Sequence, residues 1–422
     1  MNRKASFVMS FTSAILILFS ISFNCHAQVN PNESDKSEKK PQIEKKENEE
    51  DIKNPSEEIK EETPQEALLR IYTERNKALV SGDMTKLKEL FDIRQKTGLW
   101  ALEHEVKRVK YLKHWAKERG IEFTNIQSEI RVKRNSNRGD KFIMALEESY
   151  KFDYIYPDDN PAVLNSFGVG IRHGVSMIKR EGKWIVFNDW YTDCFEDAIA
   201  GFTGDIPQNT NQSNGADTIK KPNVSNMPKT EVISNLRGAW GYNREKAVQY
   251  ADKYCGSAWG SGNNYKYNKL YRDFTGIGGD CTNFASQVLG DKKEGGGLRF
   301  GGGWHCQYYK YGGSEGSRAW VNADGLRDYL IHSGRGSLIK KGVYKELAVG
   351  NENNTVPAVN RLQLGDLVAY QKKGDIDHFA VVTGRDSRGY PLINSHTTDR
   401  YHVPWDLGWG DKWIKFHLIH VN

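Results

Sequence analysis

Apolar and polar residues follow two different periods in the first half of the chain. Between Leu68 and Trp115, apolar residues recur at the spacing of one helix face, which predicts helices. From Ile121 to Val186 apolar and polar residues alternate, and this predicts strands, the last two joined by a turn at residues 180–183. Helices followed by an antiparallel sheet are typical of the α+β class, so we expect one α+β domain at residues 63–200.

The second half combines both patterns and is rich in glycine and aromatic residues. A helical pattern at residues 242–254 precedes a Gly-rich loop, and a second helix is expected to begin at Cys281. Strand-like runs follow between Gly365 and Thr397, separated by polar turns. We therefore expect a second α+β domain at residues 236–422.

Two segments lack the apolar residues that a folded core requires. Residues 28–62 contain almost no aliphatic residue and no aromatic one. Such a tract cannot bury enough apolar surface to offset its chain entropy, so we expect a disordered charged linker. Residues 201–235 are rich in Gly, Asn, Ser, Thr and Pro, which predicts a second, flexible linker.

The first 27 residues have the pattern of a secretory signal peptide. Arg3 and Lys4 supply the positive start, residues 7–23 are mostly apolar, and small residues precede a cleavage site near Ala27. An uncleaved membrane anchor is the alternative, although the apolar stretch carries serines and is short for a span. We expect a secreted or cell-envelope protein with no stable membrane association after cleavage.

The charge of the chain is nearly balanced. Sixty basic and 54 acidic residues leave a net charge of +6, and the excess is scattered, so we do not predict a nucleic-acid partner. No Cys–His cluster has the spacing of a zinc site. The Gly-rich loop at residues 295–303 lacks a following Gly-Lys-Ser/Thr, which argues against a phosphate site. We expect neither a metal nor another cofactor.

Four cysteines remain once Cys25 leaves with the signal peptide. In an exported chain they could form two disulfides, and any catalytic role for one of them must be weighed against that reading. Cys255 and Cys306 are the better candidates for a mutual pair, which leaves Cys194 and Cys281.

A candidate nucleophile lies in the motif Gly-Gly-Asp-Cys-Thr-Asn-Phe. Gly278 and Gly279 interrupt the preceding chain and Asp280 is a good N-cap, which puts Cys281 in the first turn of a helix. There the unpaired N–H groups and the positive dipole end favour a thiolate, and they can hold the oxyanion of an acyl intermediate. A structural cysteine at a helix start would show the same local pattern.

Candidates for the base and its partner follow later in the chain. His378 is expected to open a hydrophobic strand at a loop edge, where an imidazole can be both held and exposed. Asn394 and His396 lie two residues apart on the next strand, so both face the same side of the sheet. Either could fix the tautomer of His378 and complete a Cys–His–polar set. The sequence does not separate these two alternatives.

Several motifs together resemble a known family. GGDCTNFASQ, GDLVAY, DHFAVVTGRDSRGYPLINSHTTDR and YNREKAVQYADKYC look like the family named "Putative amidase domain", found in secreted Gram-positive proteins and related to NlpC-type and CHAP hydrolases. The resemblance covers nearly all of residues 236–422. It implies a papain-like fold, with Cys281 as nucleophile and His378 as base. The family's His-Thr pair falls on His396, which favours His396 over Asn394 as the third member.

The first domain resembles a different group. Its helices-then-sheet order, ending in Gly-Lys-Trp-Ile-Val and Asp189-Trp190-Tyr191, is similar to the cone-shaped nuclear-transport-factor and SnoaL-like superfamily. That fold hosts enzymes and inert partners alike, so we assign this domain no chemistry.

The resemblance to the amidase family implies an exported cysteine amidase or peptidase that hydrolyses amide bonds, with a peptide or peptidoglycan-type substrate. Aromatic residues that could line its cleft are Trp259, Tyr265, Trp304, Tyr308 and Tyr309. The alternatives are a non-catalytic papain-like module that binds wall peptides or a protein partner, and an acyltransferase with the same residues. The sequence predicts no oligomeric state.

Overall fold

The computed structural model describes residues 61–202, 238–309, 314–349, 356–410 and 412–422. The signal peptide expected at residues 1–27 lies outside these ranges, as do nearly all of the expected linkers at residues 28–62 and 201–235. Residues 60–422 group into one compact unit.

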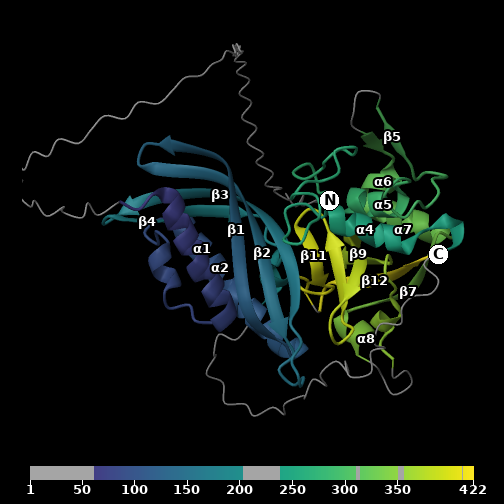
Figure 1. The fold of residues 1–422 in the computed structure, drawn as a ribbon, viewed down its shortest axis with the longest axis horizontal. Helices are drawn as coiled ribbons and strands as arrows, with labels where there is room; N and C mark the ends of the chain where they lie inside the picture. Colours follow the sequence, from purple (N-terminus) through teal and green to yellow (C-terminus); the bar gives the residue numbers. More distant parts are fainter. Residues whose placement is uncertain (1–60, 203–237, 310–313, 350–355, 411) are drawn as a thin grey trace, which may run out of the picture. The chain divides into compact units, whose positions relative to one another are not determined.

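The first part of the chain forms helices and then four long strands, as their periods predicted. The elements are α1 (Pro64–Ser81), η1 (Leu87–Leu90), α2 (Lys96–Arg119), β1 (Glu122–Arg138), β2 (Lys141–Ile155), β3 (Asn165–Arg180), β4 (Lys183–Tyr191) and α3 (Glu196–Gly201). Helix α1 begins where Thr63 and Glu66 form a capping box. Helices α1 and α2 pack against the sheet that these strands form (Figure 1).

The second part places helices first and most of its strands last. The helices are η3 (Ala239–Gly241), α4 (Arg244–Tyr254), α5 (Cys281–Gly290), α6 (Arg318–Val321), α7 (Ala323–His332), α8 (Tyr344–Ala348) and η4 (Ala358–Arg361). The strands are β5 (Cys306–Tyr308), β6 (Ser314–Gly316), β7 (Gly336–Gly342), β8 (Leu367–Lys372), β9 (Asp375–Arg385), β10 (Pro391–Ser395), β11 (Asp399–Pro404) and β12 (Lys415–Val421). Helices α4, α5 and α7 all contact β9.

One antiparallel sheet runs through both parts. Its strand order is β1-β2-β3-β11-β10-β9-β8-β12-β7, with β4 also paired to β3. The junction is β3–β11, where Gly170 and Gly168 pair with Asp399 and Tyr401. A Cβ atom at Gly168 would lie 2.0 Å from the carbonyl oxygen of Trp259, so glycine is needed for the loop after α4 to cross β3. The two predicted α+β regions are therefore continuous through their sheet.

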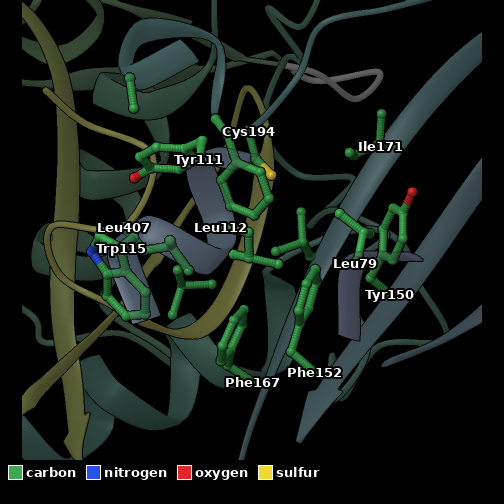
Figure 2. Close-up of a cluster of buried hydrophobic side chains, with 14 of the residues drawn as sticks. Leu79, Tyr111, Leu112, Trp115, Tyr150, Phe152, Phe167, Ile171, Cys194 and Leu407 are labelled. Carbon is green, nitrogen blue, oxygen red and sulfur yellow. The ribbon is translucent and has the colours of Figure 1, made fainter. Parts of the chain in front are cut away.

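Buried side chains on one side of this sheet come from both parts of the chain. One hydrophobic cluster contains Phe152 and Phe167, stacked 4.6 Å apart, together with Trp115 and Leu407. Figure 2 shows Leu407 of the second part together with Trp115 of α2 in this cluster. The buried carboxylate of Asp406 accepts hydrogen bonds from Trp115 Nε1 at 2.9 Å and from Arg119 at 2.6 Å. Burial and a charge-assisted contact thus join α2 to the loop after β11.

The predicted mixed α+β class is confirmed, since helices pack against a large antiparallel sheet. No helix within the described ranges combines the length and apolar character that a membrane crossing requires.

Candidate active site

Cys281 is the first residue of α5, as predicted, and two glycines bring the chain to it. Gly278 and Gly279 have φ angles of 106° and 103°, a conformation that other L residues rarely adopt. The first N–H groups of an α-helix have no carbonyl acceptor within the helix, so they surround the Cys281 side chain with positive partial charge. The local geometry is that of an anion-binding helix start.

Asp280 precedes the helix but does not cap it with its side chain. Its Oδ1 accepts from the Phe274 N–H at 3.0 Å, and its Oδ2 lies 2.6 Å from His396 Nδ1. The expected capping bond is therefore replaced by a buried contact with the turn after β10. Strand β10 ends at Ser395, so His396 lies in this turn, directly beside the start of α5, and not on the strand as the sequence predicted.

Hydrogen bonds and ring stacking fix the side chain of His396. Its Nε2–H donates to the carbonyl oxygen of Tyr254 at 2.7 Å, while Nδ1 meets Asp280. The ring is stacked between Tyr267 and Phe284, each 3.8 Å away between ring centroids. Both ring nitrogens are thus used by α4 and the start of α5, and neither points to His378.

Asn394 is also fully engaged elsewhere. Its Oδ1 accepts from the Thr383 hydroxyl at 2.8 Å and from the His402 N–H at 2.7 Å, and its Nδ2 donates to Asp252 at 2.9 Å. The expectation that His396 or Asn394 orients His378 is therefore not met in this structure. Asn394 pairs with Val381, three residues beyond His378, and strand alternation puts that position on the opposite sheet face from His378.

His378 lies inside β9, not at its opening. The strand begins at Asp375, and His378 pairs with Tyr370 of β8. Its ring contacts Tyr370 and Trp409, with centroids 5.6 Å and 5.2 Å away. The side chain is buried, and its Nε2 atom has no hydrogen-bond partner among the described residues. This nitrogen is therefore free to accept a proton or to bind a ligand or a water molecule.

Cys281 and His378 line the same pocket, which has a volume of about 400 Å³. Gly278, Gly279 and Thr397 line it beside Cys281, while Trp409 and Arg400 line it beside His378. Among the described residues, no hydrogen bond joins the sulfur to the imidazole. Catalytic hydrogen bonds often form only when substrate binds, so this geometry is compatible with a proton-sharing pair.

The pocket favours the neutral forms of both groups. Burial raises the pKa of the Cys281 thiol, and hydrogen bonds from the Phe379 backbone and the Thr282 hydroxyl oppose this only in part. Burial also lowers the pKa of His378 well below its usual value, with further effects from the positive charge of Arg400 and from His396. The structure therefore contains a thiol and a neutral imidazole that can accept a proton.

One wall of the pocket comes from the first part of the chain. Cys194, Glu196, Asp197 and Ala200, in and before α3, line it together with Cys281 and His378. Asp197 forms an ion pair with Lys372 of β8, which also lines the pocket.

Backbone contacts hold this wall in place. Arg400 donates to the carbonyl oxygen of Cys194 at 2.6 Å, and the Ala198 N–H donates to the carbonyl oxygen of Gly408 at 3.2 Å. A Cβ atom at Gly408 would lie 2.2 Å from the Cys194 carbonyl oxygen, so only glycine permits this approach. Helix α3 therefore covers the pocket as a tightly packed element.

The cysteines and aromatic residues singled out in the sequence take other positions. Cys194, Cys255, Cys281 and Cys306 are all free and buried, so the expected Cys255–Cys306 pairing is wrong. None of the aromatic residues expected at the cleft is among those that line this pocket; Trp304, for example, is part of the second hydrophobic cluster.

Arg400, Trp409 and the α3 residues were missed because they carry no local motif. The described residues contain no group of three or more His, Cys, Asp or Glu side chains that could hold a metal ion.

Comparisons with known proteins match the second part of the chain. Residues 241–419 match the family described as "Putative amidase domain". The chain is 30% identical over 171 residues to "Uncharacterized protein YhbB" of Bacillus subtilis (strain 168). That match covers 40% of this chain and 45% of YhbB, so the chain spans less than half of that relative.

Among solved structures, the intermembrane space region of chloroplast protein ARC6 matches 29% of this chain and 92% of its own, at 10% identity. Its TM-score of 0.21 supports no argument about fold. The amidase-domain resemblance predicted from the sequence is confirmed. Residues 241–419 are thus similar to the "Putative amidase domain" family, a description that suggests amide hydrolysis.

Proposed function

We propose that this chain hydrolyses amide bonds with Cys281 as nucleophile and His378 as base, in a papain-like arrangement of helix and sheet. The observation that carries the proposal is that both side chains line one pocket, with the sulfur at the positive end of α5. The Nε2 atom of His378, which has no hydrogen-bond partner among the described residues, can accept the proton of the Cys281 thiol.

The chemistry follows from these positions. His378 Nε2 accepts the thiol proton as the Cys281 sulfur attacks the amide carbonyl carbon, and N–H groups at the start of α5 stabilise the oxyanion. The intermediate collapses to a thioester when the C–N bond breaks, and the imidazolium returns its proton to the leaving amine. His378 then takes a proton from water, the hydroxide attacks the thioester, and the acid and free thiol are released.

Because burial favours thiol and neutral imidazole, proton transfer is expected to accompany attack instead of preceding it. In this respect the pair would act as a serine–histidine pair does, with the histidine as general base. Asp280 and His396 act as positioning residues, since they hold the start of α5 against the turn after β10.

The wider proposal concerns place and substrate. We infer export from the sequence of residues 1–27, and a cell-wall peptide as substrate from the relatedness of the amidase family to wall hydrolases. Residues 63–200 are proposed to be a SnoaL-like domain whose last helix borders the site. The alternative is a non-catalytic module that binds wall peptides or a protein partner, and the burial of both catalytic candidates is the observation that favours it.

Alkylation separates these two functions without a substrate. Iodoacetamide should label Cys281 faster than Cys255 or Cys306, which serve as internal controls because they are also free and buried. His378→Ala should slow the labelling of Cys281 but not of the other two. Peptide mapping by mass spectrometry measures each rate. Labelling of Cys281 no faster than of Cys255 would favour the binding module.

Product analysis then tests the substrate. Purified peptidoglycan treated with the wild-type chain should release new amine-bearing fragments, and Cys281→Ala should lower this rate by roughly a thousandfold or more. Cys255→Ala is the matched control and should retain activity. If Cys281 is labelled fast but no fragments are released, the proposal of a cysteine hydrolase stands and peptidoglycan is rejected as its substrate. An acyltransferase would instead form new amides when amines are added.

A further inference from the structure

A second cavity, about 670 Å³ in volume, adjoins the catalytic pocket across α3. Different residues of that short helix face the two spaces: Asp197 and Ala200 line the catalytic pocket, whereas Ala198 and Gly201 line the second cavity. Trp409 lines both. The volume lies within the range of small-ligand sites in proteins. None of the residues proposed for amide hydrolysis lines this cavity.

We propose that the second cavity binds an anionic saccharide chain, such as a carboxylated or phosphorylated glycan. The first argument is charge. Lys110, Lys113, Arg119 and Lys412 line the cavity, and no carboxylate is among its described lining residues.

The four cationic side chains of the cavity differ in whether a hydrogen bond or ion pair already engages them. Arg119 is engaged by Asp406, and the Nζ of Lys113 donates to the carbonyl oxygen of Val80 at 3.1 Å. Lys110 and Lys412 make no ion pair with any described residue. Their charges therefore remain available to an anionic group, which a cavity with one sign of charge attracts.

The second argument is an exposed aromatic ring. The Trp413 side chain lines the cavity and is 47% exposed. Glycines allow it to lie flat on its support: a Cβ atom at Gly201 or Gly410 would lie 1.8 Å or 2.2 Å from the indole. The ring is thus fixed from one side and open on the other.

The indole ring of Trp413 and the lysines of the cavity together indicate the class of ligand. The face of an indole is electron-rich and attracts the polarised C–H bonds of a pyranose ring, while lysines attract its acidic substituents. Single-stranded nucleic acid also combines stacking with phosphate contacts, but it needs a basic groove and successive stacking rings. Here Trp413 is the one exposed tryptophan, tyrosine or phenylalanine among the described lining residues, beside the exposed imidazole of His114, and the chain's net charge is only +6.

Binding can be measured without turnover in the full chain carrying Cys281→Ala. Isothermal titration with an oligogalacturonate should show binding that weakens as salt is added, because charges carry it. A neutral maltooligosaccharide of equal length should bind much more weakly. Trp413→Ala and Lys412→Ala should each weaken oligogalacturonate binding by about tenfold. Trp190→Ala, which removes a 69% exposed tryptophan on β4, and Lys183→Ala are the matched controls and should bind normally.

Other results would overturn the proposal. Equal binding of the neutral and acidic sugars would show that charge does not contribute to binding. If the control variants lose as much affinity as Trp413→Ala and Lys412→Ala, the sugar binds elsewhere on the chain. Tighter binding of an oligothymidylate would identify a nucleic-acid site. If the Cys281→Ala chain melts at the wild-type temperature and binds none of these oligomers, the site itself is rejected. Since Cys281 is absent throughout, none of these results depends on amide hydrolysis.

Discussion

The carboxylate of Asp280 and the Nδ1 atom of His396 lie 2.6 Å apart, and this buried contact joins the start of α5 to the turn directly after β10. The residue next to Asp280 is Cys281, so the same contact sets the position of the sulfur. His396 in turn donates to the Tyr254 carbonyl oxygen at the end of α4. Three elements that surround the candidate site therefore meet at one histidine.

Removal of this carboxylate should loosen the start of α5. Breaking a buried pair leaves a polar group without its partner, so Asp280→Ala should lower the free energy of unfolding by roughly 3–5 kcal/mol. Asp280→Asn should cost less, because its amide oxygen can still accept from the Phe274 N–H. Urea unfolding measures both. Asp375→Ala, at an exposed strand end, is the control. A loss no larger than that of the control would show that His396 is not held through Asp280.

Release of α3 should expose Cys281. Asp197 and Lys372 form a partly exposed ion pair, a contact worth about 0.2–1 kcal/mol, so Asp197→Ala should speed iodoacetamide labelling of Cys281 by up to roughly fivefold. Glu196→Ala removes the same charge from the same helix and leaves the ion pair intact. If both variants label at the wild-type rate, α3 does not limit access to the sulfur.

The pH dependence of labelling should reflect the buried thiol. Burial raises the pKa of Cys281, so the labelling rate should continue to rise through the ordinary range of cysteine thiols, about 8.5, without levelling off there. Asp197→Ala, which admits water, should move the profile to lower pH. A wild-type rate that is already at a plateau near neutral pH would instead indicate a preformed thiolate–imidazolium pair.

Stability of the first part of the chain should fall at alkaline pH because of His173. Burial opposes a charge on this ring, but Asp189 and Glu148 outweigh it and raise the pKa of His173 to about 9. Below about pH 6.5 the folded and unfolded chains both bind the proton and the contribution is complete. As the pH rises through about 9 the folded chain loses that proton, and on the order of 3 kcal/mol of stability disappears.

His173→Gln should flatten this slope of unfolding free energy against pH between about 6.5 and 9, as measured by urea unfolding at each pH. His417→Gln is the control, since burial lowers the pKa of His417 to about 4 and it titrates outside this window. The same slope in both variants would assign the alkaline loss to other groups.

Features that depend on neighbours in the chain could be predicted. The two glycines and the apolar residues after Asp280 place Cys281 in the first turn of α5, and the structure agrees. The alternation around His378 predicts a strand, although β9 begins three residues earlier than expected because the hairpin with β8 pairs as far as Asp375. Periodicity reports such local structure because helix and strand repeats are set by backbone geometry.

The partners of the polar side chains could not be predicted in this way. His396 and Asn394 have the spacing of a third catalytic member, yet α4 supplies the partners that bind them, Tyr254 and Asp252. Nothing in the sequence near Asn394 indicates that a helix more than a hundred residues earlier packs against it. A buried polar group binds whichever partner packing brings close, so spacing alone cannot identify that partner.

By itself, therefore, the sequence determined the α+β class, the helix that begins at Cys281, the strand that carries His378 and the resemblance of nearly all of residues 236–422 to an amidase family. Only the tertiary structure decided that one sheet continues from β3 into β11, that α3 walls the pocket, and that Arg400 and Trp409 line it. The physical reason is distance along the chain. Backbone periods act over a few residues, whereas a pocket is made by side chains from distant elements that share one core.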